Sequence, residues 1–274
     1  MDIIQRNFFR LLRSGAYNSH EQIEPMSACK WDRLCQLAVM HNVVPYVYHG
    51  LMECKGQFFL KLKDAQWDNW LKLVNEADKH TQESDDDEFL RADHLTNPLL
   101  NSKLQDILDD EQSDFTSRKL LLMIIRIVRH ILNEGMPVKQ LVELGIFLRQ
   151  EGKKVDQQTF MKWIGSLKLQ PMCQLEGEFL VLLMGFEKEQ LFFMGNKANK
   201  DIEKIAQELI EFTNTRSQDW YFSQDTDSIF VHNSNTTAMF SHVRRSARYF
   251  RYYPSESLTN FFASFAHSLS HIEE

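Results

Sequence analysis

Apolar residues recur at spacings of three and four along most of this sequence, which is the pattern of helices with one buried face. The pattern predicts helices over residues 3–13, 58–77 and 138–150. Residues 118–133 are apolar on nearly every side, so this segment should form the central helix of the fold. Further helices are expected over 31–42, 156–169 and 201–212, in the apolar run 179–184, and from Ser255 toward the C-terminal end.

Several residues indicate where these helices should begin and end. Gly135 and Pro137 should stop the central helix, because glycine accepts a left-handed backbone and proline cannot continue the hydrogen-bonded ladder. Asp156 is a good N-cap for the helix that follows it. Ser255 is expected to cap the last helix, with Glu256 placed favourably in its first turn.

The fold class predicted from these patterns is mainly α, a multi-helix, bundle-like architecture with little or no β-sheet. Only 10 glycines and 6 prolines occur in 274 residues, too few for many strands joined by tight turns. Residues 43–48 have strand-forming side chains. Pro45 nevertheless fits the first turn of a helix running to Leu51, and the helix is the preferred interpretation.

The polar stretch over residues 78–98 interrupts the helical pattern. Charged residues of both signs follow one another there with few apolar anchors, which indicates a loop or a boundary. The expected organisation is an N-terminal helical region over 1–77, a polar linker over 78–117 and a C-terminal helical region over 118–274. The two helical regions could form one continuous domain.

Composition and charge narrow the classes of function. Hydrophobic residues make up 43% and charged residues 25% of the chain, as in globular proteins. The net charge of −7 argues against general nucleic-acid binding, because neutralising phosphates requires a basic face. Neither a secretory signal nor an apolar run long enough to cross a bilayer is visible, so we expect a cytoplasmic protein that does not engage a membrane.

The cysteines and histidines give no sign of a metal or another cofactor. No CxxC pair occurs, and no histidine lies at zinc-ligand spacing from a cysteine. We therefore expect reduced thiols that behave as small apolar side chains. The four cysteines are Cys29, Cys35, Cys54 and Cys173.

Charged residues inside apolar helices are the first candidates for a binding site. Arg126, Arg129 and His130 interrupt the central helix, where an unpaired charge would be costly. The favoured interpretation is a set of buried or boundary pairs with carboxylates such as Glu143; the alternative is an anion-binding pocket. His41 could contact a ligand, although a histidine at a helix C-terminus more often caps the helix.

A basic aromatic cluster near the C-terminal end is the strongest local concentration of cations. Arginine beside aromatic rings can grip phosphates and stack on bases. A solvated helix face is still favoured, because the surrounding chain is acidic. The acidic run Asp85–Glu88 has neither a glycine turn nor spaced ligands, so a solvated loop is favoured over a cation site. The cluster comprises Arg244, Arg245, Arg248 and Arg251, interleaved with Tyr249, Phe250, Tyr252 and Tyr253.

Three stretches carry a resemblance to a known family. The first is a Trp-x-x-Leu helix over 31–34, followed by a His-x-Val-x-Pro motif with an aromatic over 41–46. The second is the helical pattern over 130–144 with Val155, Asp156 and Gly185, and the third is the ending 248–256. Together they resemble the bacterial family of uncharacterised nucleotidyltransferases over about two thirds of the chain.

The resemblance implies a catalytic core that this sequence lacks. Members of the family are expected to carry a glycine-rich turn and an Asp-x-Asp pair, which hold the triphosphate and its divalent metal. Only about 40 residues separate Ala77 from Arg118, and none of them is glycine. Asp106, Asp109 and Asp110 fall in an expected helix with their side chains toward solvent. Gly165-Ser166 lies within another expected helix, with no carboxylate pair after it.

The sequence therefore predicts no catalytic residue, no metal and no cofactor. The favoured hypothesis is a non-catalytic, nucleotidyltransferase-like helical protein that acts as a binding or interaction module. One alternative is an enzyme of that family with a phosphate or nucleotide site rebuilt from His41, the Arg126–His130 group and the Arg244–Arg251 cluster. Another is a subunit that complements a separate catalytic chain. The expected partner is a protein or a phosphate-bearing small molecule.

Overall fold

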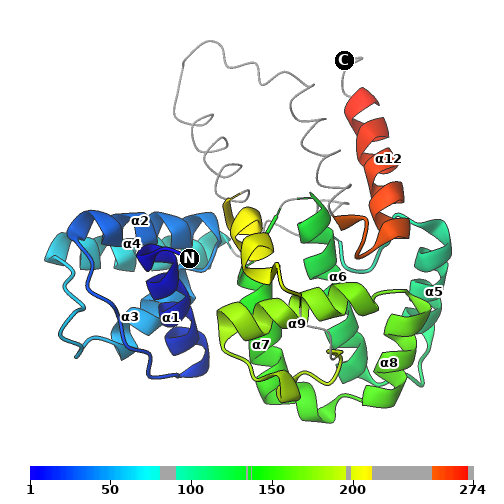
Figure 1. Cartoon of the computed structure of the whole chain (residues 1–274), viewed down its shortest axis with the longest axis horizontal. Coiled ribbons are helices and arrows are strands. Elements are labelled where there is room, and N and C mark those ends of the chain that lie inside the picture. Colours follow the sequence, from blue (N-terminus) through cyan, green and yellow to red (C-terminus); the bar gives the residue numbers. More distant parts are fainter. Residues whose placement is uncertain (81–90, 134, 137, 196–198, 212–248, 271–274) are drawn as a thin grey trace.

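The computed structural model describes residues 1–80, 91–133, 135–136, 138–195, 199–211 and 249–270. Within these ranges the backbone forms helices, short 3-10 turns and loops, and no β-strand occurs. The mainly α, bundle-like class predicted from the sequence is thereby confirmed. Figure 1 shows two groups of helices lying side by side, one built from the N-terminal residues and one from the rest of the described chain.

The N-terminal group consists of four helices. They are α1 (Ile3–Tyr17), α2 (Ala28–Met40), α3 (Val44–Glu53) and α4 (Asp64–His80). Helices α1 and α3 pack closely together, because glycines at their crossing leave room for backbone. A Cβ at Gly15 would overlap the carbonyl of Tyr46, and one at Gly50 would overlap the carbonyl of Leu11.

The C-terminal group is arranged around one helix, α6 (Phe115–Asn133). Its residues Leu121, Ile124 and Val128 are fully buried, which confirms the prediction of a central helix. The other helices of this group are α5 (Pro98–Asp109), α7 (Val138–Glu151), α8 (Gln157–Ser166), α9 (Gln170–Met184), a helix over 202–211 and α12 (Pro254–Ser270), with 3-10 turns at Gly152–Lys154 and Lys188–Gln190.

Two predicted helix starts are confirmed by the local geometry. Pro45 lies in the first turn of α3, where its missing N–H costs no hydrogen bond. Asp156 caps α8, since its carboxylate accepts hydrogen bonds from the backbone N–H groups of Gln158 and Thr159. These hydrogen bonds favour the ionised carboxylate, and together with one from the Thr159 hydroxyl they lower the pKa of Asp156.

Two other predicted starts are wrong. The helix expected from Phe58 begins at Asp64, and the preceding residues form turns and loop. The last helix begins at Pro254, so Ser255 lies in its first turn and does not cap it. In the first case the hydrophobic pattern continues beyond the helix, because apolar side chains such as Leu62 also pack on the core from a loop. In the second case the helix begins earlier than predicted, because proline fits the first turn of a helix.

Part of the segment expected to be a polar linker packs as a core element. Helix α5 buries Leu100, Leu104 and Ile107, while Asp106 and Asp109 are exposed as expected. The acidic run Asp85–Glu88, expected to be a solvated loop, lies outside the described residues. None of the described helices is long and apolar enough to cross a membrane.

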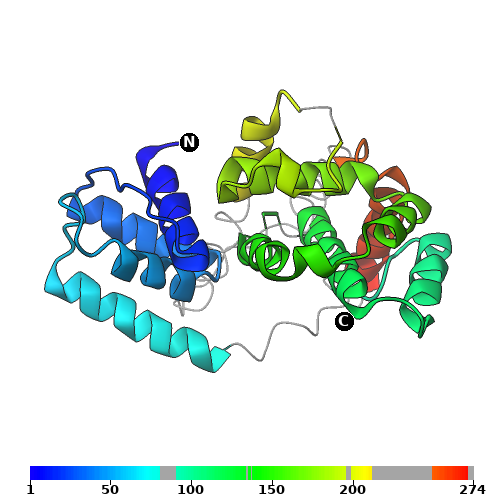
Figure 2. The ribbon, with the colours of Figure 1, turned by 90° about the horizontal axis from the view of Figure 1, so that it is seen from below.

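The two groups meet where α1 packs against α7 and α9 (Figure 2). Tyr17, the last residue of α1, lies edge-on to Phe186. The guanidinium of Arg149 lies 4.4 Å from the centroid of the Tyr17 ring. Arg13 donates a hydrogen bond of 2.9 Å to the carbonyl of Leu183. Burial raises the pKa of Tyr17, so its hydroxyl stays neutral at this contact.

Candidate functional site: the groove between α6 and α7

Helices α6 and α7 form an antiparallel hairpin. Near the turn, the side chains of His130 and Gln140 lie 3.1 Å apart. Toward the far end, the ammonium of Lys119 lies 5.5 Å from the ring centroid of Phe147. The two helices therefore run side by side in opposite directions. One face of each helix borders the same space.

This space is a cavity of about 950 Å³, which we call the α6–α7 groove. Its walls come from four segments, so the fold and not a single motif creates it. From the N-terminal group only Tyr46 of α3 contributes, which places the groove beside the junction of the two groups. The other lining residues are Phe115, Thr116, Lys119, Leu122, Met123 and Arg126 of α6; Gln140, Glu143, Ile146, Phe147, Gln150 and Glu151 of α7; and Arg91, Ala92 and Asp93.

The middle of the groove is apolar. Leu122, Met123 and Ile146 are half-buried there, and Phe147 is almost fully buried. Phe115, at the N-terminal end of α6, leaves 72% of its surface exposed. Single exposed apolar residues are ordinary, but an exposed phenylalanine continuous with an apolar groove is typical of a binding surface.

Charged side chains line the groove in equal numbers of each sign. Arg91, Lys119 and Arg126 are matched by Asp93, Glu143 and Glu151. Three of these side chains are held in ion pairs: Arg91 bonds Asp93 at 2.8 Å, and Glu151 bonds Lys154 outside the groove at 2.6 Å. The hydrogen bond from Arg91 lowers the pKa of Asp93, so this carboxylate is ionised at neutral pH. The lining carries no net charge.

A second polar arrangement on α6 lies next to the groove residues in sequence but is completely enclosed. Arg129 is 0% exposed and donates from Nη1 to Oε1 of Glu256 at 2.9 Å. Glu256 is also 0% exposed and lies in the first turn of α12. Its carboxylate accepts further hydrogen bonds from the backbone N–H and hydroxyl of Thr96 and the N–H of Asn97.

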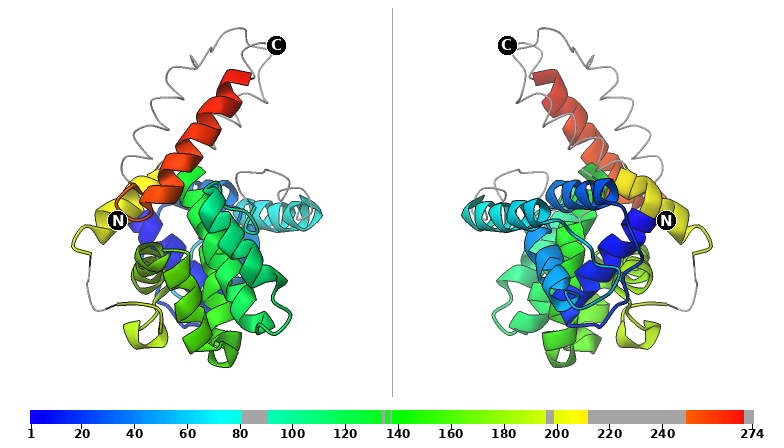
Figure 3. Two further views of the ribbon diagram at one scale, coloured as in Figure 1. Left: turned by 90° about the vertical axis from the view of Figure 1, so that its right-hand side faces the viewer. Right: turned by 90° about the vertical axis from the view of Figure 1, so that its left-hand side faces the viewer.

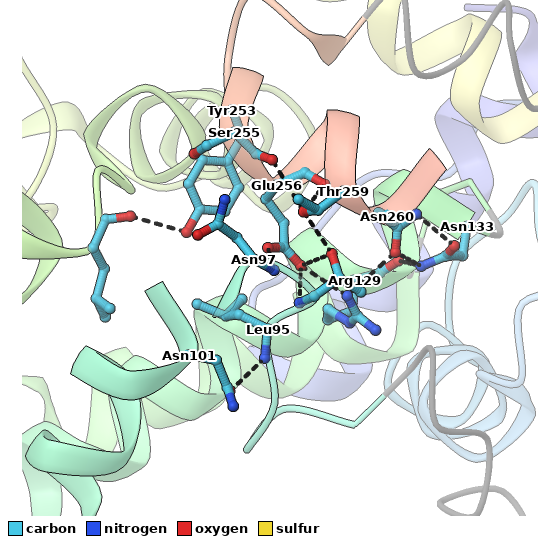
Figure 4. A network of polar contacts seen from close by, with 12 residues as sticks. Leu95, Asn97, Asn101, Arg129, Asn133, Tyr253, Ser255, Glu256, Thr259 and Asn260 are labelled. Carbon is cyan, nitrogen blue, oxygen red and sulfur yellow. Dashed lines mark hydrogen bonds and ion pairs between the residues drawn. The ribbon is translucent and has the colours of Figure 1, made fainter. Parts of the chain in front are cut away.

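Two asparagines extend this network (Figure 4). Asn260, one turn further along α12, accepts from Arg129 and donates to Asn133 at 2.9 Å. Tyr253 at the base of α12 donates to the carbonyl of Leu167 at 2.9 Å. We call the group of Thr96, Asn97, Arg129, Asn133, Glu256 and Asn260 the clasp, because hydrogen bonds among them join three segments that are far apart in sequence. The clasp fixes α12 to the central helix.

The structure distributes the predicted site residues of the central helix over different environments. Arg126 lines the groove. Arg129 is in the clasp, where its carboxylate partner is Glu256. His130 is half-buried and contacts Gln140, which lines the groove.

The other predicted residues are not among those that line the groove. His41 is 4% exposed in the N-terminal group, where it is the C-cap residue of α2 and packs beside Phe8. Arg251 is exposed and donates to the hydroxyl of Tyr252 at 2.6 Å, with its guanidinium 4.7 Å from that ring. Arg244, Arg245 and Arg248 lie outside the described residues.

Sequence reasoning missed the apolar half of the groove and the anchoring role of Glu256. Hydrophobic spacing does not distinguish Phe115, Lys119 and Ile146 as groove residues, because a residue on the exposed edge of a buried helix has the same sequence pattern as a core residue. Spacing gave a usable signal, since Phe115, Lys119, Leu122, Met123 and Arg126 recur at three and four along α6.

Glu176, on α9, is a buried carboxylate that sequence reasoning also missed. It is 0% exposed, and neither of its oxygens has a hydrogen-bond partner among the described residues. Burial raises the pKa of Glu176 well above the value in water, so the side chain is held protonated. Cys173, one turn earlier, is also fully buried, and the four cysteines form no disulfide.

Within the described part of the chain, no three His, Cys, Asp or Glu side chains are grouped so that they could hold a metal ion. No protein-family model matches the chain, and no curated protein or solved structure matches it either.

Proposed function

We propose that this protein is a non-catalytic interaction module that holds an amphipathic helix of a partner in the α6–α7 groove. The observation that carries the proposal is the composition of the groove: two parallel rows of side chains, apolar in the middle and charged at intervals without net charge. A helix with one apolar face and mixed charges at its edges complements such a surface.

The length of the groove fits a short helix. Its lining residues on α6 run from Phe115 to Arg126. At 1.5 Å per residue this distance is about 17 Å, or about three helical turns. A three-turn helix presents apolar residues at i, i+3 or i+4, and i+7, enough to cover Phe115, Leu122 and Ile146.

The resemblance to nucleotidyltransferases favours another ligand, a nucleotide or other phosphate-bearing molecule. Phosphates are normally bound by an excess of cations or by helix N-termini, and the groove has three cations against three carboxylates. This balance supports a peptide over a nucleotide. The missing glycine turn and Asp pair support the absence of catalysis. A partner that itself carries catalytic residues would be consistent with the proposal.

Selection from a displayed library of short helical peptides tests the proposal. The wild-type protein should enrich peptides with apolar residues at helical spacing. Phe115→Ala should weaken their binding at least about tenfold, because an exposed aromatic ring contributes on the order of 1.4 kcal/mol or more at a well-packed interface. Phe58→Ala is the matched control, since Phe58 is 76% exposed and lies outside the groove.

Two results would contradict the proposal. One is the enrichment of peptides that bind wild type and Phe115→Ala equally well. The other is a rise in melting temperature with ATP or another nucleoside triphosphate plus Mg²⁺ that Phe115→Ala leaves intact and Arg126→Met abolishes. The second result would instead favour the phosphate-binding alternative.

A further inference from the structure

Helix α12 presents an exposed apolar stripe. Leu258, Phe262 and Phe265 are 48%, 58% and 37% exposed and lie on one side of the helix at spacings of four and three. Phe261 lies beside them, with its ring stacked 6.3 Å from that of Phe265. The buried residues of α12 lie near its base, and two of them, Glu256 and Asn260, belong to the clasp. Beyond the base, α12 projects from the other described helices, as Figures 1 and 3 both show.

The same helix has almost no charge. Glu256 is its only Asp, Glu, Lys or Arg, and that carboxylate is buried in the clasp. A helix that binds a membrane surface normally combines its apolar stripe with lysine or arginine, which α12 lacks. An uncharged stripe instead suits an apolar protein surface without net charge. The middle of the α6–α7 groove of this chain, lined by Leu122, Met123, Ile146 and Phe147, is such a surface.

We infer that two copies of this chain pair by each inserting α12 into the α6–α7 groove of the other. This inference rests on the proposed function, and it identifies the helix bound in the groove as α12 of a second copy. The apolar stripe runs from Leu258 to Phe265, about 11 Å at 1.5 Å per residue, which is shorter than the groove. The clasp holds the base of α12 rigidly, so the stripe is presented in one fixed direction.

The expected buried area favours a reciprocal pair over a single contact. Aromatic side chains bury about 150–250 Å² each, so the partly exposed stripe offers on the order of 300 Å². One stripe in one groove then buries roughly 600 Å² from both sides, which gives only a weak contact. Two reciprocal contacts double this to roughly 1,200 Å², the lower limit of stable interfaces. The dimer should therefore be weak and concentration-dependent.

Sedimentation velocity of the full chain over a range of concentrations tests this pairing. Because each copy carries a net charge of −7, the measurement should be made at about 0.15 M salt or above, where repulsion is screened. Wild type should dimerise. Phe262→Ser and Phe115→Ala should each raise the dissociation constant at least about tenfold. The control Phe58→Ala should sediment like wild type.

A mixture of the two variants gives the sharpest result. The Phe262→Ser copy keeps an intact groove and the Phe115→Ala copy keeps an intact α12, so one of the two contacts is restored. The mixture should therefore contain more dimer than either variant alone, and less than wild type. Unchanged melting temperatures of both variants will show that they are folded.

Three results would overturn the inference. The first is a wild-type protein that stays monomeric at all concentrations. The second is a dimer weakened by Phe262→Ser but not by Phe115→Ala, which would indicate pairing of α12 with α12. The third is a mixture with no more dimer than the separate variants. If the chain is monomeric and displayed peptides still bind in a Phe115-dependent way, only the self-pairing fails. If the chain is monomeric and no peptide binds in this way, the proposed function fails too.

Discussion

Arg126 and Arg129 are one helical turn apart on α6, yet they lie in opposite environments. Arg129 is 0% exposed and donates to the buried carboxylate of Glu256, so its charge is used to join α6 to α12. Arg126 lines an open groove with apolar walls. The comparison shows that a cation in an apolar helix can be part of the scaffold or part of a surface. The partner that decides between these roles can be far away in sequence.

The largest effect is expected from breaking the clasp. Arg129→Met leaves the Glu256 carboxylate buried without its cation, and the loss of one member of a buried ion pair costs about 3–5 kcal/mol. The double variant Arg129→Met/Glu256→Gln should lose less than the sum of the single losses, because no buried charge is left unpaired. Urea denaturation measures these differences in the free energy of unfolding.

Arg126→Met is the matched control for this comparison. It changes the same residue type on the same helix, and its cost should stay within about 1 kcal/mol, as is usual for partly exposed positions. Equal losses for Arg126→Met and Arg129→Met would contradict the division into groove and clasp.

A smaller effect is expected at the contact between the two helical groups. A Cβ at Gly145 would overlap the Tyr17 hydroxyl and lie 3.1 Å from the Phe186 ring. Gly145→Ala should therefore destabilise the protein by about 1–3 kcal/mol through overpacking, partly offset by the better helix propensity of alanine. Thermal unfolding would show the loss. Gly152→Ala, with only ordinary contacts at 3.8 Å, is the control. A more stable Gly145→Ala protein would show that α1 does not pack tightly on α7.

Glu176 should make stability depend on pH. Burial raises its pKa in the folded state, so the folded chain binds this proton more tightly than the unfolded chain. The resulting stabilisation is present below the unfolded pKa of about 4.5 and is lost as the pH rises above it toward the folded pKa. Glu176→Gln stays neutral at every pH. Wild type should therefore lose stability relative to this variant as the pH rises above about 4.5 toward the folded pKa.

Urea denaturation at several pH values measures this difference. A single proton limits its slope to about 1.4 kcal/mol per pH unit. A difference between wild type and Glu176→Gln that stays constant over this range would show that the carboxylate is not held protonated in the folded chain.

The smallest stability effect is expected in the groove. Phe115 is 72% exposed, so Phe115→Ala should change the free energy of unfolding by no more than about 0.5 kcal/mol. The same substitution is expected to weaken peptide binding at least about tenfold. A large loss of stability would assign the exposed ring to the scaffold, and the contrast between the groove and the clasp would fail.

Local sequence patterns were sufficient to predict most of the helices, but they did not predict the groove or the clasp. The spacing of Leu121, Ile124 and Val128 predicts a buried helix, because burial of that face depends on neighbours three and four residues away. Arg126 and Arg129 cannot be told apart from their local sequence, because each is a cation within the same apolar helix. Their roles diverge because Glu256 lies 127 residues from Arg129, a pairing that hydrophobic spacing does not encode. The groove likewise depends on how α7 folds back on α6.

Hydrogen–deuterium exchange of the wild-type chain, with and without a peptide selected by display, tests the central claim most directly. Binding in the groove should slow exchange over residues 115–126 and 140–151, since both helices contact the peptide. Exchange at the clasp residues 96–97 should not change. Protection centred on the clasp, on α1–α4, or absent from α6 and α7 would contradict the assignment of the groove as the binding site.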